Sequence, residues 1–351
     1  MSAYVIRLRT ENRRKRKAQK RLSKTKKPKT GKSMIGDYER AGERMVIQEI
    51  DNVKFRLKKP CDLTWIKKYG TVFSVIDATG SGCICFGVGN GKDRYFIKIA
   101  GVDTVDAEIS PGESVETLKN AAELYQILKH QNLVELLEHY PVLDCYAAVF
   151  RWVEGECLFD HWNFEKYDKN PGEAGPAGRF KKLSPGRKLS AAECLFSFLE
   201  NVSARHYVAV DFYDGSLIYD FAADKMMICD IDLFRKQPAY NDAGEAYWGT
   251  KRLKAPEEYR LGAVIDEATN VFTLGALMFE FFGKYTQEEI DRRYKDNQFL
   301  PCKIECWSLG SASYSAVLRA VDFDREKRYP SISDFHKAFL EAIRADEKSL
   351  S

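Results

Sequence analysis

Two aspartates 19 positions apart are the residues of this chain best suited by type and spacing to chemistry. Asp211 ends a short apolar run in VAVDFYDGSLIYD, and Asp230 ends another in ICDIDLF. Both settings predict a polar loop beside a strand, from which a carboxylate can reach a ligand on a rigid base. Carboxylates placed in this way hold hard cations such as Mg²⁺ or accept a proton from a hydroxyl group. The alternative for Asp211 is an ordinary hairpin with an exposed aspartate.

A lysine and a glutamate earlier in the chain could supply charge for phosphate binding. Lys98 lies in the apolar, strand-like run YFIKI, and Glu123 lies in ESVETLKNAAELYQILKH, where apolar residues recur at helical spacing. A lysine within a strand usually faces solvent unless it has a partner. Phosphoryl transfer requires positive charge on the α- and β-phosphates, and a glutamate can hold the lysine in place through a charge-assisted hydrogen bond.

The elements that must position these residues divide the chain at about residue 153. From 45 to 153 the runs MVIQEI, VKFRL, TVFSVI, YFIKI, LVELLEHY and CYAAVFRWV predict strands around one main helix. From 154 to 345 we expect mainly helices, including one from Ser190 to about Ala204, an apolar one from Thr269 and a terminal one in SDFHKAFLEAIRA. LIYDF and MMICD predict a hairpin, and the Gly/Pro-rich residues 168–188 predict a flexible insertion.

The order of these motifs resembles the eukaryotic-type Ser/Thr protein kinase superfamily over roughly residues 65 to 345. Two later motifs strengthen the resemblance: Ala255-Pro256-Glu257 matches the APE motif, and Arg328 in DREKRYP matches the late arginine. The resemblance implies an α+β, two-lobed fold with an antiparallel β-rich first lobe containing one main helix and a mainly helical second lobe. It also implies a buried ion pair between Glu257 and Arg328.

The resemblance assigns roles to individual residues. The catalytic set would be Asp211 as proton acceptor, Lys98 with Glu123 on the phosphates, and Thr250 in GTKRLKAPE beside the catalytic aspartate, which favours Ser/Thr hydroxyls as acceptors. ATP would be held by Gly80, Ser81, Gly82, Phe96, Lys98, Phe150 and Trp152. Mg²⁺ would be held by Asp230, Ser216 and Asp232.

Several positions depart from the family pattern. Ala209 and Val210 stand where the family has His-Arg, so activity is not expected to depend on phosphorylation of the activation loop. Tyr213 replaces the catalytic-loop lysine, which leaves another cation, such as Lys251, to meet the transition-state charge. Ser216 replaces the metal-binding asparagine, and a serine hydroxyl can ligate Mg²⁺.

Two further departures lie outside the catalytic loop. Phe96 replaces a small residue expected against the adenine. Asn270 replaces the helix aspartate that anchors the catalytic loop, and its amide oxygen can still accept a backbone hydrogen bond.

Three functions fit these observations. The first is an ATP- and Mg²⁺-dependent Ser/Thr protein kinase. The second is a kinase acting on a small-molecule alcohol of the aminoglycoside or choline type. It is considered because FRWVEGECLFDHW resembles the hinge of those enzymes. The third is a pseudokinase that binds nucleotide or a partner. Glu257, Thr250 and Arg328 argue against the small-molecule kinase, and Tyr213, Ser216 and Phe96 support the pseudokinase.

Composition sets the remaining expectations. The chain has 351 residues, 44% hydrophobic and 30% charged, with no apolar run long enough to span a membrane and no secretory signal, so we expect a cytoplasmic protein. Nine scattered cysteines without a CxxC pair favour reduced thiols over a zinc site or disulfides.

The charge of the chain is concentrated at its N-terminus. Residues 1–35 carry fourteen Lys or Arg against one acid, and the whole chain carries +4. Residues 1–44 therefore predict a disordered basic arm, with nucleic acid as an alternative partner. A second hypothesis is that translation begins at Met45, because Gly42-Glu43-Arg44 permits a purine-rich codon choice typical of a bacterial ribosome-binding site.

Overall fold

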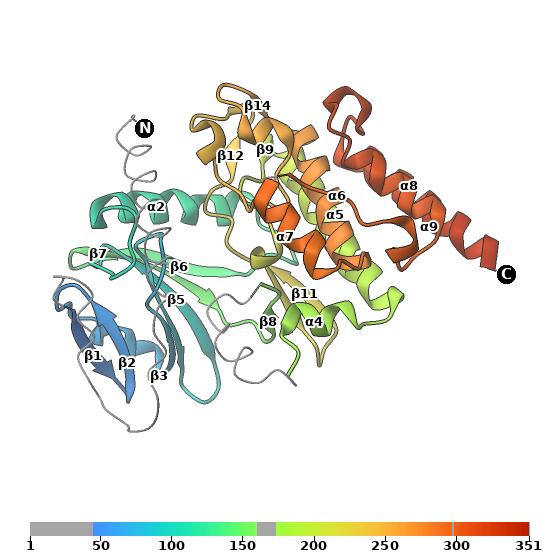
Figure 1. Cartoon of the computed structure of the whole chain (residues 1–351). Coiled ribbons are helices and arrows are strands. Elements are labelled where there is room, and N and C mark those ends of the chain that lie inside the picture. The colour runs from blue at the N-terminus through green and yellow to red at the C-terminus, as the bar shows by residue number, and fades with distance from the viewer. Residues whose placement is uncertain (1–44, 160–172, 297, 351) are drawn as a thin grey trace, which may run out of the picture. The chain divides into compact units, whose positions relative to one another are not determined.

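The computed structural model of the chain describes residues 45–159, 173–296 and 298–350 (Figure 1). It is a mixed α+β protein with antiparallel strand pairs and several helices, as the sequence predicts at this level. The chain forms two compact units. Unit 1 runs to Val115 and includes Pro141–Ala147, whereas unit 2 contains Glu116–Tyr140 and the chain from Ala148 onward. The predicted basic arm, residues 1–44, lies outside the described residues.

Antiparallel strands form most of unit 1. A hairpin of two strands comes first, followed by three consecutive antiparallel strands, and the five-stranded sheet has the order β3-β4-β5-β7-β6. The strands of unit 1 are β1 (Val46–Ile50), β2 (Val53–Leu57), β3 (Thr71–Ile76), β4 (Ile84–Gly89) and β5 (Arg94–Ala100), whereas β6 (Leu136–Val142) and β7 (Cys145–Arg151) each have residues in both units. β4 is buried along nearly its whole length, as expected for a strand with a neighbour on each side.

Helix α2 (Pro111–Ile127) is the main helix predicted between the strands. Ser110 and Glu113 form a capping box: the Ser110 N–H donates to the Glu113 carboxylate at 2.9 Å, and the Glu113 N–H donates to the Ser110 hydroxyl at 3.3 Å. Pro111 occupies the first helical position, where its missing N–H has no cost.

Unit 2 is mainly helical. Its helices are α4 (Pro176–Lys181), α5 (Pro185–Ala204), α6 (Glu267–Phe282), α7 (Gln287–Asp296), α8 (Ser311–Ala320) and α9 (Ile332–Leu350). Helix α6 is buried along most of its length, and α5, α8 and α9 pack against it. Gly275 of α6 permits close packing, because a Cβ atom there would lie 2.8 Å from Val321 and 2.9 Å from Ala320.

Short strands and 3₁₀ turns connect these helices. The strands are β8 (Glu156–Cys157), β9 (Tyr207–Val208), β10 (Leu217–Asp220), β11 (Lys225–Ile228), β12 (Arg235–Lys236), β13 (Ala239–Tyr240) and β14 (Val264–Ile265). β10 and β11 form the predicted hairpin. The 3₁₀ turns are η1 (Thr64–Tyr69), η2 (Asp214–Ser216), η3 (Gly244–Ala246), η4 (Pro256–Tyr259), η5 (Ile304–Cys306) and η6 (Arg325–Lys327).

The predictions for residues 168–204 were partly wrong. Helix α5 begins at Pro185 and not at Ser190, and its N-cap is Ser184, whose hydroxyl accepts from the Arg187 N–H. Within the predicted flexible insertion, Pro176–Lys181 is helical. Pro176 and Pro185 each occupy the first turn of a helix, where proline is favoured. Residues 168–172 lie outside the described part of the chain.

Within the described ranges, the structure contains no helix that is both long and apolar enough to cross a membrane.

Candidate active site

The backbone just before Asp211 is held by the side chain of Asn270. The Ala209 N–H donates to Oδ1 of Asn270, and Nδ2 of Asn270 donates to the Ala209 carbonyl, both at 2.8 Å. Asn270 lies on α6 and is buried. The prediction that Asn270 accepts a backbone hydrogen bond is therefore confirmed, and the amide adds a donor that a carboxylate lacks.

Asp211 and Asp230 lie within electrostatic range of one another in unit 2. Both have left-handed backbone conformations, with φ of 60° and 55°, which are uncommon for residues other than glycine. Burial, and after it the charge of Asp230, raises the pKa of Asp211 to about 7, against the opposing charge of Lys254. A half-buried carboxyl group with a pKa near neutral is suited to accept a proton from a hydroxyl group.

Ser216 lies next to the segment that carries Asp230. Its carbonyl accepts a hydrogen bond from the Cys229 N–H at 2.8 Å. Its hydroxyl is buried and has no hydrogen-bond partner among the residues that the structure describes. A buried hydroxyl costs free energy unless it is paired, so this oxygen is suited to a ligand such as a hard cation.

The metal site predicted from the sequence is compatible with these positions. Asp232 follows Asp230 by two residues and is half-buried. The described residues contain no group of three His, Cys, Asp or Glu side chains that could hold a metal by themselves. Mg²⁺ bound to a nucleotide needs only one or two carboxylates, because phosphate oxygens and water complete its octahedron. Asp230 and the Ser216 hydroxyl therefore fit this type of site.

Tyr213 fills the loop between the two aspartates. Its ring lies over Gly215, where a Cβ atom would clash with the ring. Burial raises the pKa of Tyr213, and the negative charges of Asp211 and Asp230 raise it further. Tyr213 is thus a neutral, half-buried neighbour of both carboxylates.

Lys254, rather than Lys251, is the lysine whose charge acts on Asp211. Lys254 is 4% exposed, and its Nζ donates to the Tyr247 carbonyl at 2.8 Å. Gly249 has a φ of 123°, and a Cβ atom there would lie 2.9 Å from Cγ of Lys254. The charge of Lys254 acts to lower the pKa of both Asp211 and Glu258, but burial outweighs it and leaves both pKa values raised.

Thr250 lies half-buried in the same segment, four residues before Lys254. Its carbonyl accepts from the Leu253 N–H at 3.0 Å, which closes a tight turn ahead of the APE motif. Its role in selecting Ser/Thr acceptors stays a prediction.

Glu257 and Arg328 form the buried ion pair predicted from the sequence. The guanidinium Nη1 and Nη2 atoms donate to the two carboxylate oxygens at 2.7 and 3.0 Å, and both residues are 2% exposed. The Thr269 hydroxyl donates to the same carboxylate at 2.9 Å. Burial alone would raise the pKa of Glu257, but the hydrogen bonds and charge of Arg328 outweigh it and hold the pKa below its usual value.

The predicted phosphate-binding turn joins β3 and β4 in unit 1. Gly82 has a φ of 71°, and the Gly80 carbonyl accepts from the Glu108 N–H at 2.9 Å. The Ser81 hydroxyl donates to the Thr79 hydroxyl at 3.3 Å. The turn is therefore fixed to the segment that leads into α2.

The other predicted nucleotide-binding residues are divided between the units. Phe96 and Lys98 lie on β5 in unit 1, opposite Gly87 and Cys85 of β4. Glu123 lies on α2 in unit 2, so its pairing with Lys98 stays a prediction.

Phe150 and Trp152 belong to unit 2, at the end of β7 and just beyond it. The buried Phe150 ring packs edge-on against Tyr125 of α2, with 4.8 Å between ring centroids. The Tyr125 oxygen accepts from the Ile231 N–H at 3.4 Å. Helix α2 is thus in contact both with the predicted hinge and with the residue that follows Asp230.

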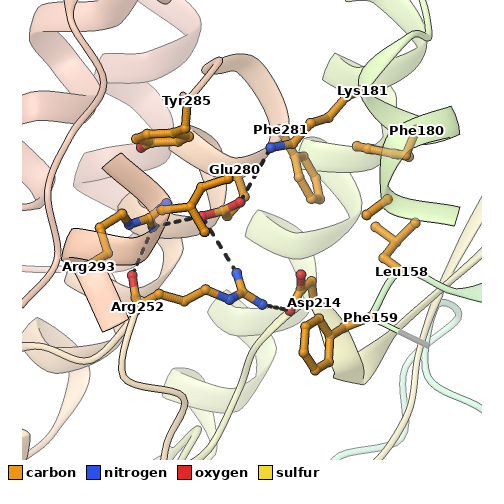
Figure 2. Close-up of a pocket in the computed structure, with 12 residues that line it drawn as sticks. Leu158, Phe159, Phe180, Lys181, Asp214, Arg252, Glu280, Phe281, Tyr285 and Arg293 are labelled. Carbon is orange, nitrogen blue, oxygen red and sulfur yellow. Dashed lines mark hydrogen bonds and ion pairs between the residues drawn. The ribbon is translucent and has the colours of Figure 1, made fainter. Parts of the chain in front are cut away.

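A buried network of charges beside the Asp211 loop was missed by the sequence analysis (Figure 2). Arg252 pairs with Asp214 and lies 3.6 Å from Glu280, and Arg293 contacts Glu280 at 2.7 Å. Burial raises the pKa of Asp214 although Arg252 opposes it. Burial would raise the pKa of Glu280 too, but Arg293, Arg252 and Lys181 together lower it to about 2.

This network borders a cavity of about 190 Å³. Aromatic rings of Phe159, Phe180, Phe281 and Tyr285 complete its wall. Phe159 also contacts Tyr213 edge-on, with 6.1 Å between ring centroids, so the cavity adjoins the Asp211 loop. The signal in the sequence was Glu280, a single acid in the apolar run LGALMFEFF, which a buried helix tolerates only when the charge is paired.

Comparison with known proteins gives no relative by sequence: no family model matches the chain, and no curated protein matches it.

Proposed function

We propose that the chain is a divergent ATP- and Mg²⁺-dependent phosphotransferase with a two-lobed, protein kinase-like fold, acting on Ser/Thr hydroxyls of proteins. The observation that carries the proposal is the proximity of Asp211 and Asp230. The two residues come from separate loops and share a left-handed backbone, and the buried cation Lys254 acts on Asp211.

In the proposed reaction Asp211 accepts the proton of the acceptor hydroxyl. The acceptor oxygen forms a bond to the γ-phosphorus of ATP while the bond from that phosphorus to the bridging oxygen breaks, which releases ADP. Asp230 and Ser216 would hold Mg²⁺, with Asp232 as an additional ligand. The metal supplies positive charge to the β- and γ-phosphate oxygens when it is bound.

Charge in this site is arranged without the usual catalytic-loop lysine. Lys254 supplies a buried positive charge next to Asp211, and Lys98, held by Glu123, would bind the α- and β-phosphates. With Val210 in place of the arginine before Asp211, the loop lacks the cation that receives a phosphorylated activation segment. We therefore expect activity that does not depend on phosphorylation of that segment.

A pseudokinase is the second candidate, and Tyr213 is the observation that favours it. By the resemblance to protein kinases, Tyr213 stands in the place of a lysine that would meet the transferred phosphoryl group, and its ring is neutral. A protein of this kind would bind nucleotide without transferring phosphate.

The test uses the full chain and two measurements. Thermal shift with ATP, with and without Mg²⁺, detects binding, since a ligand at 100 times its Kd stabilises the folded state by about 2.7 kcal/mol. Transfer of labelled γ-phosphate is then measured to casein and to a panel of aminoglycosides. We expect a Mg²⁺-dependent shift and transfer to casein.

Two variants identify the site. Asp211→Asn and Asp230→Asn are each expected to lower transfer by roughly 10²- to 10⁴-fold, whereas Asp242→Asn, which removes an exposed carboxylate paired to Arg235, is expected to leave it unchanged. Binding without transfer to any acceptor would favour the pseudokinase. Absence of both binding and transfer would exclude the two proposals together.

A further inference from the structure

Two thiols that are 84 positions apart in the sequence meet in unit 1. The Sγ atoms of Cys61 and Cys145 are 4.0 Å apart and within hydrogen-bonding range. Cys145 is the first residue of β7 and is 6% exposed, whereas Cys61 lies in the loop after β2 and is only half-buried. Cys61 is thus the more exposed residue of the pair, and the sulfur of the buried Cys145 lies within 4.0 Å of its own.

The loop that carries Cys61 is fixed in place by contacts of its own. Gln48 of β1 binds the Cys61 peptide from both sides: its Oε1 accepts from the Cys61 N–H at 2.8 Å, and its Nε2 donates to the Cys61 carbonyl at 3.0 Å. The Lys58 N–H donates to the Asp103 carbonyl at 2.8 Å, and the Lys59 ammonium contacts the Asp103 carboxylate at 3.2 Å. These contacts hold the loop in place and so keep the Cys61 thiol close to the Cys145 thiol.

The backbone at Cys145 is equally restricted. Gly101, with a φ of 91°, approaches it so closely that a Cβ atom there would lie 3.0 Å from Cα of Cys145 and 2.7 Å from the Asp144 carbonyl. The strand end that presents the second thiol is therefore packed against the end of β5.

The two thiols differ in reactivity. The hydrogen bond from Cys145 lowers the pKa of Cys61 to about 7, although burial and the charges of Asp62 and Asp144 oppose the shift. The same contact raises the pKa of Cys145. Because the thiolate is the nucleophile, Cys61 is the thiol that reacts first.

We propose that Cys61 and Cys145 form an oxidation site, at which a hydroperoxide converts the thiol pair into a disulfide that joins the loop after β2 to the start of β7. The Cys61 thiolate attacks the peroxide oxygen, the O–O bond breaks, and the alkoxide leaves as an alcohol after protonation, which gives a sulfenic acid. The Cys145 sulfur then attacks the Cys61 sulfur and displaces the hydroxyl group as water, with the Cys145 proton going to the water. Two thiols lose two electrons in total, and the peroxide gains them.

The geometry requires a short movement for the second step. The sulfurs must approach from 4.0 Å to about 2.0 Å, the length of a disulfide bond. Rotation of the half-exposed Cys61 side chain, with a small shift of its loop, can supply this movement.

The experiment treats the reduced full chain with hydrogen peroxide, alkylates the remaining thiols and maps peptides by mass spectrometry without reduction. We expect a Cys61–Cys145 linked peptide that dithiothreitol removes, together with a rise in Tm. In Cys145→Ser we expect Cys61 to stop at a sulfenic acid that dimedone traps. In Cys61→Ser we expect Cys145 to stay reduced.

Cys302 and Cys306 provide the matched control, since they are two other neighbouring cysteines, one buried and one half-buried. Cys302→Ser is expected to leave the Cys61–Cys145 link unchanged. A Cys302–Cys306 link formed in equal yield would overturn the proposal, as would a Cys61 that stays reduced or that is oxidised to sulfinic acid without a linked peptide. Repeating the oxidation in guanidinium chloride is expected to abolish the preference, because the contact depends on the fold.

Discussion

Glu257 and Glu258 are consecutive buried residues whose carboxyl groups have opposite environments. Glu257 is bound by both nitrogens of the Arg328 fork, and its pKa is lowered. Glu258 accepts the Ala255 N–H at 2.7 Å, and burial raises its pKa to about 8 although the Lys254 charge opposes it. The same contrast separates Glu280, which two arginines contact, from Asp211, which faces Asp230.

The two carboxyl environments have different roles, one structural and one suited to chemistry. Carboxylates saturated by guanidinium groups stay ionised and hold segments together, as Glu257 does for the APE motif. Around Asp211 and Glu258, the charge of the single cation Lys254 does not outweigh the effect of burial, and the pKa of both carboxyl groups is raised. Such an imbalance is unfavourable for stability, and it is typical of sites that bind a cation or move a proton.

Removal of Arg328 is expected to have the largest effect. Arg328→Met leaves the Glu257 carboxylate buried without its partner, and breaking such a pair costs about 3–5 kcal/mol of unfolding free energy. Urea denaturation measures the loss. Arg260→Met, at an exposed arginine nearby, is the control and is expected to change stability by less than about 0.5 kcal/mol. The double variant Glu257→Met/Arg328→Met should recover much of the loss, and a failure to do so would contradict the assignment of this pair to architecture.

Asn270→Asp is expected to have the next largest effect. A carboxylate can accept the Ala209 N–H but cannot donate to the Ala209 carbonyl, which lies 2.8 Å from Nδ2 of the amide. The buried carbonyl loses its donor and faces a negative charge, at a cost of about 1–3 kcal/mol, which urea denaturation measures. Asn120→Asp, at an exposed position of α2, is the control. An Asn270→Asp variant as stable as the native chain would show that the hydrogen bond from Nδ2 to the Ala209 carbonyl is not needed.

The pH dependence of stability is the smallest expected effect. The unfolding free energy changes little per pH unit, but the direction of the change is opposite for the two carboxyl environments. The pKa of Asp211 is raised in the folded state to about 7 from 3.8, so its ionisation makes the fold less stable as pH rises from about 4 to 7. The pKa of Glu280 is lowered from 4.5 to about 2, so its stabilisation is present above pH 4.5 and is lost as pH falls through 2. The slope for one group is at most about 1.4 kcal/mol per pH unit.

The two slopes can be separated by substitution. Relative to the native chain, Asp211→Asn should gain stability as pH rises from 4 to 7, whereas Glu280→Gln should cost more at pH 5 than at pH 3. Urea denaturation across this range measures both differences. Parallel slopes would show that the two carboxyl environments are not distinct.

The sequence predicted features that depend on local pattern or on a distinctive motif. Alternating and helical spacing predicted strands β1, β2, β3, β5, β6 and β7 and helices α2, α5, α6 and α9 within a few residues. The APE motif with its late arginine predicted the Glu257–Arg328 pair. The start of α5 was misplaced because Ser190 and Glu193 have the spacing of a capping box, whereas the N-cap is Ser184, just before Pro185.

Features that depend on tertiary packing alone were not predictable. Arg252, Glu280 and Arg293 have no characteristic spacing, and their pairing depends on how α6, α7 and the segment before the APE motif meet. The sequence does not show which of Lys251 and Lys254 acts on Asp211, because the two differ only in their burial in the fold. The Cys61–Cys145 contact joins residues that no spacing rule connects.

The hydrogen bond between the Tyr125 oxygen and the Ile231 N–H has a mechanical consequence. It holds the peptide just after Asp230 from a helix 106 residues earlier in the chain, so the left-handed turn at Asp230 is braced from a distance and not only by its own neighbours. Helix α2 therefore helps to hold the conformation of this turn. A displacement of the helix at Tyr125 by the length of one hydrogen bond would release the peptide and let the Asp230 carboxylate reorient.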